Sequence, residues 1–308
     1  MDTLKKTLPF CLLLVMANIF QLRAELRFEG VVPAGVNRQA LAVEYSRIYR
    51  TVAPLQRPDR SVLRIVYFSK TDKIENAGIL PEWGGGGAIG GNLIIIPTDF
   101  KPFLEQNFSQ VTVHEIVHSV LYRAYPGVNI PRWFHEGLAM LMSGELSFEE
   151  SSVLSKAIFL SRLMPLASID SVNGFGRNRA DLAYSQSHCA LRFLTDNYSM
   201  EVIADILRKA QRMHDFWKGL NEAVGLSPAE FEDLTRKYIV SKYQFVFLIT
   251  DYYAWWVGIA LLVIVGFFVT MRRNRKRAEA MDEAERREIA AAAEASIEKS
   301  EPEKNAPP

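Results

Sequence analysis

Cysteine is scarce in this sequence. Its 308 residues include two cysteines, Cys11 and Cys189, which is too few for a small scaffold held together by disulfides. Because Cys11 lies in an N-terminal apolar run that we expect to be removed, the mature chain would keep Cys189 alone. No internal disulfide can then stabilise the domain, and a disulfide-rich fold is excluded.

Excess charge of either sign is also missing. The formal net charge is +1, so the composition gives no electrostatic basis for a nucleic-acid partner. Hydrophobic residues make up 49% of the chain, which at this length is enough for a sizeable core. The sequence also has no internal repeat, which argues against a solenoid.

A phosphate-binding loop is missing too, although glycine is concentrated in one segment. Residues 83–91 read Trp-Gly-Gly-Gly-Gly-Ala-Ile-Gly-Gly, but no Gly-Lys-Ser/Thr follows them and no helix opens directly after them. The strand that we predict next, residues 92–97, stops at its proline. The glycines fit either a substrate-side loop, whose bare backbone lets a peptide approach closely, or a mobile hairpin connection.

The N-terminus carries the first of two long apolar runs. Lys5 and Lys6 precede an apolar stretch over residues 7–20, and the small residue Ala24 follows. This order predicts a secretory signal peptide over residues 1–24. An uncleaved anchor is the alternative, because Leu22 fits poorly at position −3 of a cleavage site before Glu25.

The second apolar run, Tyr252–Met271, has twenty residues without a charge, a length that crosses the ~30 Å hydrocarbon core of a bilayer as a helix. Aromatic residues gather at its start, and five arginines and lysines follow within residues 272–277, which places that end in the cytoplasm. We therefore expect a single-pass protein of the cell membrane. Its domain, residues 25–245, would be extracytoplasmic (periplasmic in a bacterium), and its charged tail, residues 272–308, would be cytoplasmic and open to a membrane-protein partner.

Between these runs, the pattern changes from mixed to helical. A helix is expected near residues 38–50, and strands are expected at 61–68 and 92–97. From about Ser109 onward the chain is almost wholly helical, and further helical patterns cover residues 131–143, 148–161, 179–197, 200–213 and 228–242. This order predicts an α+β fold in two lobes, with a small mixed sheet and the helix after Ser109 in front and a helical lobe behind.

The segment His114-Glu115-Ile116-Val117-His118 carries the clearest chemistry. Two histidines four residues apart lie one turn apart on the same face of a helix, where their ring nitrogens can hold one zinc ion. The glutamate beside the first histidine can act as the general base on a water at that metal. The segment therefore predicts two zinc ligands, His114 and His118, and a base, Glu115.

A catalytic zinc site needs a third protein ligand, which must come from elsewhere in the chain. The segment Pro131–Ala139 reads Pro-Arg-Trp-Phe-His-Glu-Gly-Leu-Ala, and its proline is well placed to open a helix that returns toward the first. His135 and Glu136 are both candidate ligands. Neighbours on a helix point about 100° apart, so only one of the two can face the metal.

The His-Glu-x-x-His segment followed by Trp-Phe-x-Glu-Gly-Leu-Ala resembles the gluzincin metallopeptidases, the clan of thermolysin and aminopeptidase N, and in particular their peptidase MA-like relatives. The resemblance covers about residues 61–197. It implies a zincin-like fold, Glu136 as the third zinc ligand and a peptide or protein substrate.

The same resemblance implies two further features around the site. An edge strand should pair with the substrate backbone, and Gly91–Ile96 occupies the corresponding place, so Gly91, Asn92 and Leu93 are expected substrate-binding residues. A tyrosine on a later helix should stabilise the oxyanion, and Tyr184 in Ala-Tyr-Ser-Gln-Ser corresponds to it.

Both late candidates have a structural alternative. The sequence fits equally well with Tyr184 as a core residue whose hydroxyl makes a structural hydrogen bond. His188 lies one turn beyond Tyr184 on the same face of the helix. It fits either a second catalytic donor or a polar residue packed in the core. The overall expectation is a membrane-anchored zinc metallopeptidase. A non-catalytic gluzincin-like scaffold or binding module at the membrane surface is the alternative.

Overall fold

The computed structural model describes residues 25–56, 61–69, 85–99, 107–144, 148–246 and 252–298. Contacts divide the chain into two compact units, Met1–Phe247 and Leu248–Pro308. The first unit contains a small sheet and packed helices, and the second contains one long helix. The predicted signal peptide lies outside the described residues.

The sheet has four strands in the order β1-β2-β4-β3, with bounds β1 (Leu26–Gly30), β2 (Leu63–Phe68), β3 (Gly87–Ile89) and β4 (Leu93–Pro97). β1, β2 and β4 run parallel, and β3 pairs with β4 in the antiparallel direction. The α+β prediction with a small mixed sheet is therefore confirmed. Three successive isoleucines of β4 are fully buried (Ile94, Ile95 and Ile96), as expected of a strand covered on both faces.

The expected edge strand is wrong. β4, which contains most of Gly91–Ile96, lies between β2 and β3, so the edge strands in the described part of the chain are β1 and β3, and β3 is the edge next to β4. The glycine-rich segment itself forms this edge, because Ala88 pairs with Ile94 across a tight connection. Gly90 and Gly91 adopt φ values of +59° and +75° in that connection, a region that glycine enters without steric cost.

Helices make up the rest of the first unit. They are α2 (Arg38–Val52), α3 (Phe108–Ala124), α4 (Arg132–Ser143), α5 (Phe148–Phe159), the 3₁₀ segment η3 (Leu166–Gly174), α6 (Arg177–Tyr198), α7 (Glu201–Met213), α8 (Phe216–Val224) and α9 (Pro228–Tyr243). The helices expected from the sequence are present, and η3 and α8 were not anticipated. Several starts have local causes: Asn37 and Asn107 accept backbone N–H groups at α2 and α3, and Ser227 and Glu230 form a capping box at α9.

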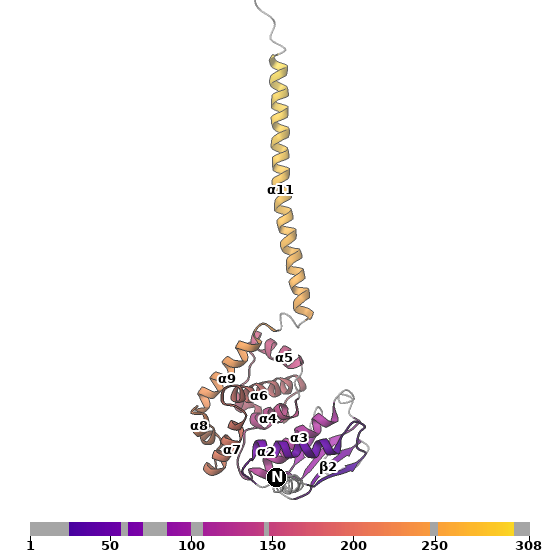
Figure 1. Ribbon diagram of the computed structural model, residues 1–308. Coiled ribbons are helices and arrows are strands. Elements are labelled where there is room, and N and C mark those ends of the chain that lie inside the picture. The colour runs from indigo at the N-terminus through magenta and orange to yellow at the C-terminus, as the bar shows by residue number, and fades with distance from the viewer. Residues whose placement is uncertain are drawn as a thin grey trace, which may run out of the picture. The chain divides into compact units, whose positions relative to one another are not determined.

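α3 is the central helix of this unit. Figure 1 shows α2 and α3 beside the sheet, with α4 to α9 gathered on the other side. α3 is buried almost all round, with Ile116, Val117, Val120 and Leu121 inaccessible to solvent. Such a helix can present polar side chains only toward another protein surface or a site, so the charged residues on α3 require partners.

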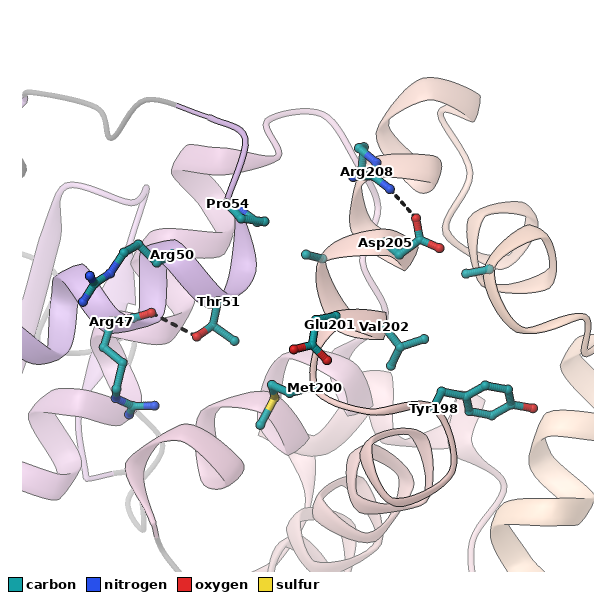
Figure 2. Close-up of a pocket in the computed structure, with 12 residues that line it drawn as sticks. Arg47, Arg50, Thr51, Pro54, Tyr198, Met200, Glu201, Val202, Asp205 and Arg208 are labelled. Carbon is teal, nitrogen blue, oxygen red and sulfur yellow. Dashed lines mark hydrogen bonds and ion pairs between the residues drawn. The ribbon is translucent and has the colours of Figure 1, made fainter.

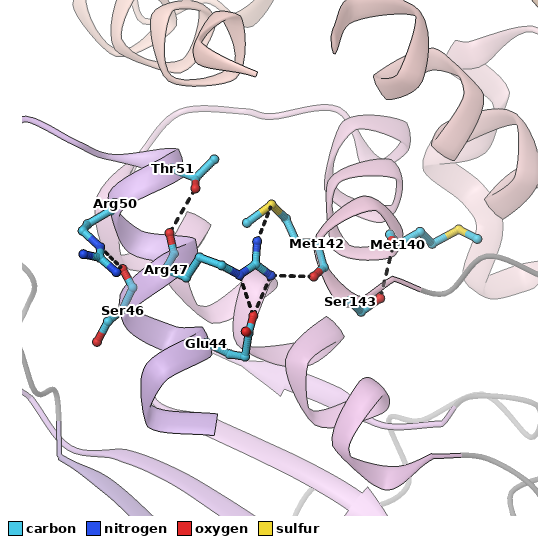
Figure 3. A network of polar contacts seen from close by, with 8 residues as sticks. All are labelled: Glu44, Ser46, Arg47, Arg50, Thr51, Met140, Met142 and Ser143. Carbon is cyan, nitrogen blue, oxygen red and sulfur yellow. Dashed lines mark hydrogen bonds and ion pairs between the residues drawn. The ribbon is translucent and has the colours of Figure 1, made fainter. Parts of the chain in front are cut away.

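Aromatic packing and one arginine fix the helix that follows it. Trp133 and Phe134 at the start of α4 are fully buried, and both pack against Phe216 of α8 with ring centroids 5.9 and 5.0 Å apart. At the other end of α4, Arg47 of α2 donates to the Met142 carbonyl oxygen at 2.7 Å (Figure 3). Contacts with α8 and α2 thus hold α4 in place at its two ends.

The second unit is the helix α11 (Tyr252–Glu298), which has 47 residues. Its apolar part has a mean hydropathy of 1.9 and is long enough to cross a membrane. Those side chains are exposed, whereas the apolar side chains of a soluble core helix would be buried. The helix is consistent with single-pass anchoring.

Candidate metal centre

α3 sets the two histidines on one face. His114 and His118 are one turn apart, and their ring centroids are separated by 5.0 Å. Both side chains are largely buried and face α4. The arrangement is the one that the His-x-x-x-His spacing predicts for a helix.

Glu136 of α4 meets both histidines. Its Oε2 atom lies 3.3 Å from His114 Nε2 and 3.5 Å from His118 Nε2. Two ligands of a tetrahedral zinc, each about 2 Å from the metal, are about 3.3 Å apart. The two distances to Glu136 are close to this value, and the three donor atoms lie within 4.8 Å of one another, so the group could hold a metal ion.

The electrostatics of Glu136 favour its charged form. Its side chain is 1% exposed, and burial alone would raise the pKa of the carboxyl group. The nearby His118, hydrogen bonds from both histidines and the Arg132 guanidinium outweigh burial, so this pKa lies well below its usual value. A deprotonated carboxylate is the form that ligates a metal.

Glu115 lies beside this cluster and is 6% exposed. Burial raises the pKa of its carboxyl group, while His118 and His114 act in the opposite direction. A backbone segment covers it: a Cβ added at Gly86 would lie 3.1 Å from Glu115 Cγ and 3.2 Å from Oε1. A side chain before β3 would therefore fit only if its neighbours gave way by a few tenths of an ångström, and Gly86 joins the candidate site as a residue that the sequence grouped with the other glycines.

Tyr184 of α6 approaches the cluster from a third element. Burial and the negative charges of Glu136 and Glu115 raise the pKa of its phenol well above the usual value, against a hydrogen bond from Arg132. The hydroxyl is thus protonated at neutral pH. The structure brings Tyr184 to the charged groups of the site, and its catalytic role stays a prediction.

His135 and His188 occupy other positions. Burial, with His118 beside it, lowers the pKa of His135 to about 3, and its ring centroid lies 5.6 Å from those of His118 and Tyr122. Among the described residues, the group of ligand atoms that could hold a metal includes Glu136 and not His135. His188 is buried one turn beyond Tyr184 on α6, and its role remains a prediction.

Gly91, Asn92 and Leu93 lie at the connection between β3 and β4. Arg123 of α3 donates to the Gly91 carbonyl oxygen at 2.7 Å and to Asn92 Oδ1 at 2.8 Å. This arginine fastens the connection to α3 two turns beyond Glu115. The three residues therefore hold the β3 edge in place, and substrate contact at them stays a prediction.

A separate pocket lies between α2 and α7 (Figure 2). Its volume is about 730 Å³, and its lining includes Arg47, Arg50, Glu201 and Arg208. None of the residues that line it belongs to the cluster of His114, His118 and Glu136. The pocket is therefore distinct from the candidate metal centre.

The family comparison agrees with this geometry. The sequence model of the Peptidase MA superfamily matches residues 50–241, which is more than half of the chain. The chain therefore belongs to the Peptidase MA superfamily, and the gluzincin-like assignment is confirmed. The match begins before β2 and ends in α9, so it extends beyond the residues 61–197 that carry the resemblance in the sequence.

One curated relative is similar to part of the chain. The uncharacterized protein YhcO of Bacillus subtilis (strain 168) is 24% identical over 159 residues. This alignment covers 47% of this chain and 47% of that protein, so the chain spans about half the length of the relative that it matches.

Proposed function

We propose that this protein is a zinc-dependent peptidase that uses His114, His118 and Glu136 as metal ligands and Glu115 as general base. The observation that supports it best is the convergence of the three ligand atoms within 4.8 Å of one another. Membership of a superfamily that is generally zinc-dependent points the same way.

The chain's own residues would divide the chemistry between them. Zinc at this site supplies Lewis acidity, which polarises a carbonyl group and acidifies water. Glu115 takes a proton from the attacking water and passes it to the leaving amine, and its raised pKa brings its basicity closer to neutral pH. Tyr184, protonated at neutral pH, donates a hydrogen bond to the developing oxyanion.

The substrate would align on the edge of the sheet. In the described residues β3 is the terminal strand next to Glu115, and an extended peptide can add to such an edge by backbone hydrogen bonds. Gly86 leaves the space beside Glu115 without a side chain. Gly91, Asn92 and Leu93 would act where the connection meets α3.

We further propose that the protein spans the membrane once and that its domain has two lobes. Residues 1–24 form a secretory signal, residues 25–245 form an extracytoplasmic domain, residues 252–271 cross the membrane and residues 272–308 remain in the cytoplasm. The exposed apolar part of α11 supports the anchor. Within the domain, the sheet with α3 forms one lobe and the helices from α4 onward form the other. His114 and His118 belong to the first lobe, and Glu136 belongs to the second.

The mechanism is tested by Glu115→Gln. This variant should bind zinc as the wild type does, because residue 115 is not a ligand, and it should lose hydrolysis of a peptide library by about 10²- to 10⁴-fold. Glu232→Gln on α9 is the matched control and should keep full activity. Full turnover by Glu115→Gln would contradict the proposed mechanism. Zinc binding without turnover by the wild type would favour the scaffold alternative.

A further inference from the structure

Arg132 stands in the first turn of α4, four residues before Glu136 and on the same face of the helix. Its Nε atom lies 2.6 Å from Glu136 Oε1, whereas the histidines approach Oε2. The two oxygens of one carboxylate are therefore divided between the arginine and the metal-binding histidines.

The same side chain reaches two other elements. Its guanidinium is close enough to Tyr184 on α6 to act against the raised pKa of that phenol, both as a positive charge and as a donor, and its Nη2 atom donates to Asn173 Oδ1 in η3 at 3.3 Å. The backbone N–H of Arg132 donates to Asp170 Oδ1, also in η3, at 2.9 Å. Asp170 and Asn173 of η3 thus hold the backbone and the side chain of Arg132, while its guanidinium faces Glu136 and Tyr184.

Only an arginine suits this position. A guanidinium is planar and carries five N–H donors in fixed directions, so it can serve a carboxylate, a phenol oxygen and an amide oxygen at once. A lysine ammonium can replace the charge but not the fixed directions. A guanidinium that donates to a phenol oxygen leaves the phenol proton to point elsewhere, where it is available to donate.

We propose that Arg132 is a positioning residue that couples the third metal ligand to the phenol. It holds Glu136 through Oε1, so that one oxygen alone faces the metal, and it orients the Tyr184 hydroxyl as a donor toward the substrate. This inference rests on the proposed function for its catalytic half. Its metal half concerns the ligand set and does not depend on turnover.

Zinc affinity tests the metal half. Arg132→Gln should weaken zinc binding by about 10- to 100-fold in a titration against a chelating dye, the range seen when the partner of a ligand is removed. Arg132→Lys keeps a charge beside Glu136 and should lose about threefold at most. Arg192→Lys is the matched control, because Arg192 and Asp196 form an i,i+4 pair on α6 at 3.3 Å, and its affinity should not change. Unchanged affinity in a folded Arg132→Gln variant would refute this half.

A double-mutant cycle tests the coupling to Tyr184. In turnover of a fluorogenic peptide library, Arg132→Lys should lower kcat about tenfold or more with KM nearly unchanged, since only transition-state stabilisation is lost. Adding Tyr184→Phe to Arg132→Lys should then reduce kcat little further. Multiplicative effects of the two changes would show that they act independently and would overturn the coupling.

Failure of the proposed function gives a different result. If the wild type binds zinc but turns over no peptide, the same cycle is measured by thermal unfolding of the metal-free full-length protein. Non-additive losses of Tm for Arg132→Lys and Tyr184→Phe support the contact between the two side chains, and additive losses refute it. The inference therefore stands or falls separately from peptidase activity.

Discussion

Gly137 follows the third candidate ligand directly, and a side chain there would collide with α6. A Cβ at this position would lie 2.2 Å from the Ser187 carbonyl oxygen and 2.6 Å from Leu191 Cδ2. Ordinary van der Waals contact begins at 3.4 Å, so α4 and α6 would have to separate by more than 1 Å at this point. Backbone atoms of α6 cannot move aside as a flexible side chain does.

The size of the effect of Gly137→Ala follows from two opposing terms. Overpacking of this severity costs about 3 kcal/mol, and alanine regains about 1 kcal/mol of helix propensity relative to glycine. The net loss of about 2 kcal/mol corresponds to a fall in Tm of about 4–8 °C for a domain of this size. Because Glu136 and Tyr184 lie on the two helices that separate, zinc affinity should fall as well.

Calorimetry and zinc titration together test this reasoning. Gly219→Ala is the matched control, because its Cβ would lie 2.4 Å from the Ala210 backbone nitrogen between α7 and α8. That variant should lose similar stability and keep the zinc affinity of the wild type. If Gly137→Ala unfolds at the wild-type temperature and binds zinc equally well, the close approach of α4 and α6 does not set the site.

Three further predictions concern pH, the metal and the connection at the sheet edge. Burial raises the pKa of Tyr125, whose hydroxyl donates to the Val52 carbonyl oxygen, to about 12. The stabilisation that the protonated phenol gives the fold is complete below the unfolded pKa of about 10 and is lost as the pH rises toward 12. Urea unfolding should therefore show the wild type losing about 2 kcal/mol of unfolding free energy relative to Tyr125→Phe over that interval. Equal slopes would contradict it. Removing zinc with a chelator should lower the free energy of unfolding by about 4 kcal/mol relative to zinc at a thousandfold excess over Kd, and an unchanged Tm would argue against a metal at this site. Arg123→Ala should lower the free energy of unfolding in urea by about 2–3 kcal/mol, because the Gly91 carbonyl and Asn92 lose a charged donor. A loss under 0.5 kcal/mol would show that the connection between β3 and β4 does not depend on Arg123.

Periodic patterns predicted the elements that are determined locally. The buried stripe of α3 and the His-x-x-x-His spacing placed His114 and His118 correctly on one face. The proline before α4 and the turn chemistry of Ser227 at α9 are equally local signals. For such features the chain within one helix contains all the information that the prediction needs.

Features that depend on partners outside their own element were missed or misplaced. β3 is only Gly-Ala-Ile, too short to show a strand pattern of its own, and it forms because Ile94 and its neighbours on β4 supply a partner strand. The role of Gly137 and the contact from Arg132 to Tyr184 depend on α6, some fifty residues further on. The spacing of Arg132 and Glu136, four residues apart, was the one readable signal for that ion pair.

α11 continues without interruption far past its apolar part. Its 47 residues, at a rise of about 1.5 Å each, make a rod about 70 Å long, of which the charged portion after Met271 accounts for about 40 Å. Arg275 and Glu279, and likewise Glu283 and Arg287, form i,i+4 pairs along this portion, and such pairs add to helix stability by a few tenths of a kcal/mol each. A continuous helix of this length would keep anything bound at its far end a fixed distance from the arginine cluster, and a glycine pair inserted in it would shorten that reach.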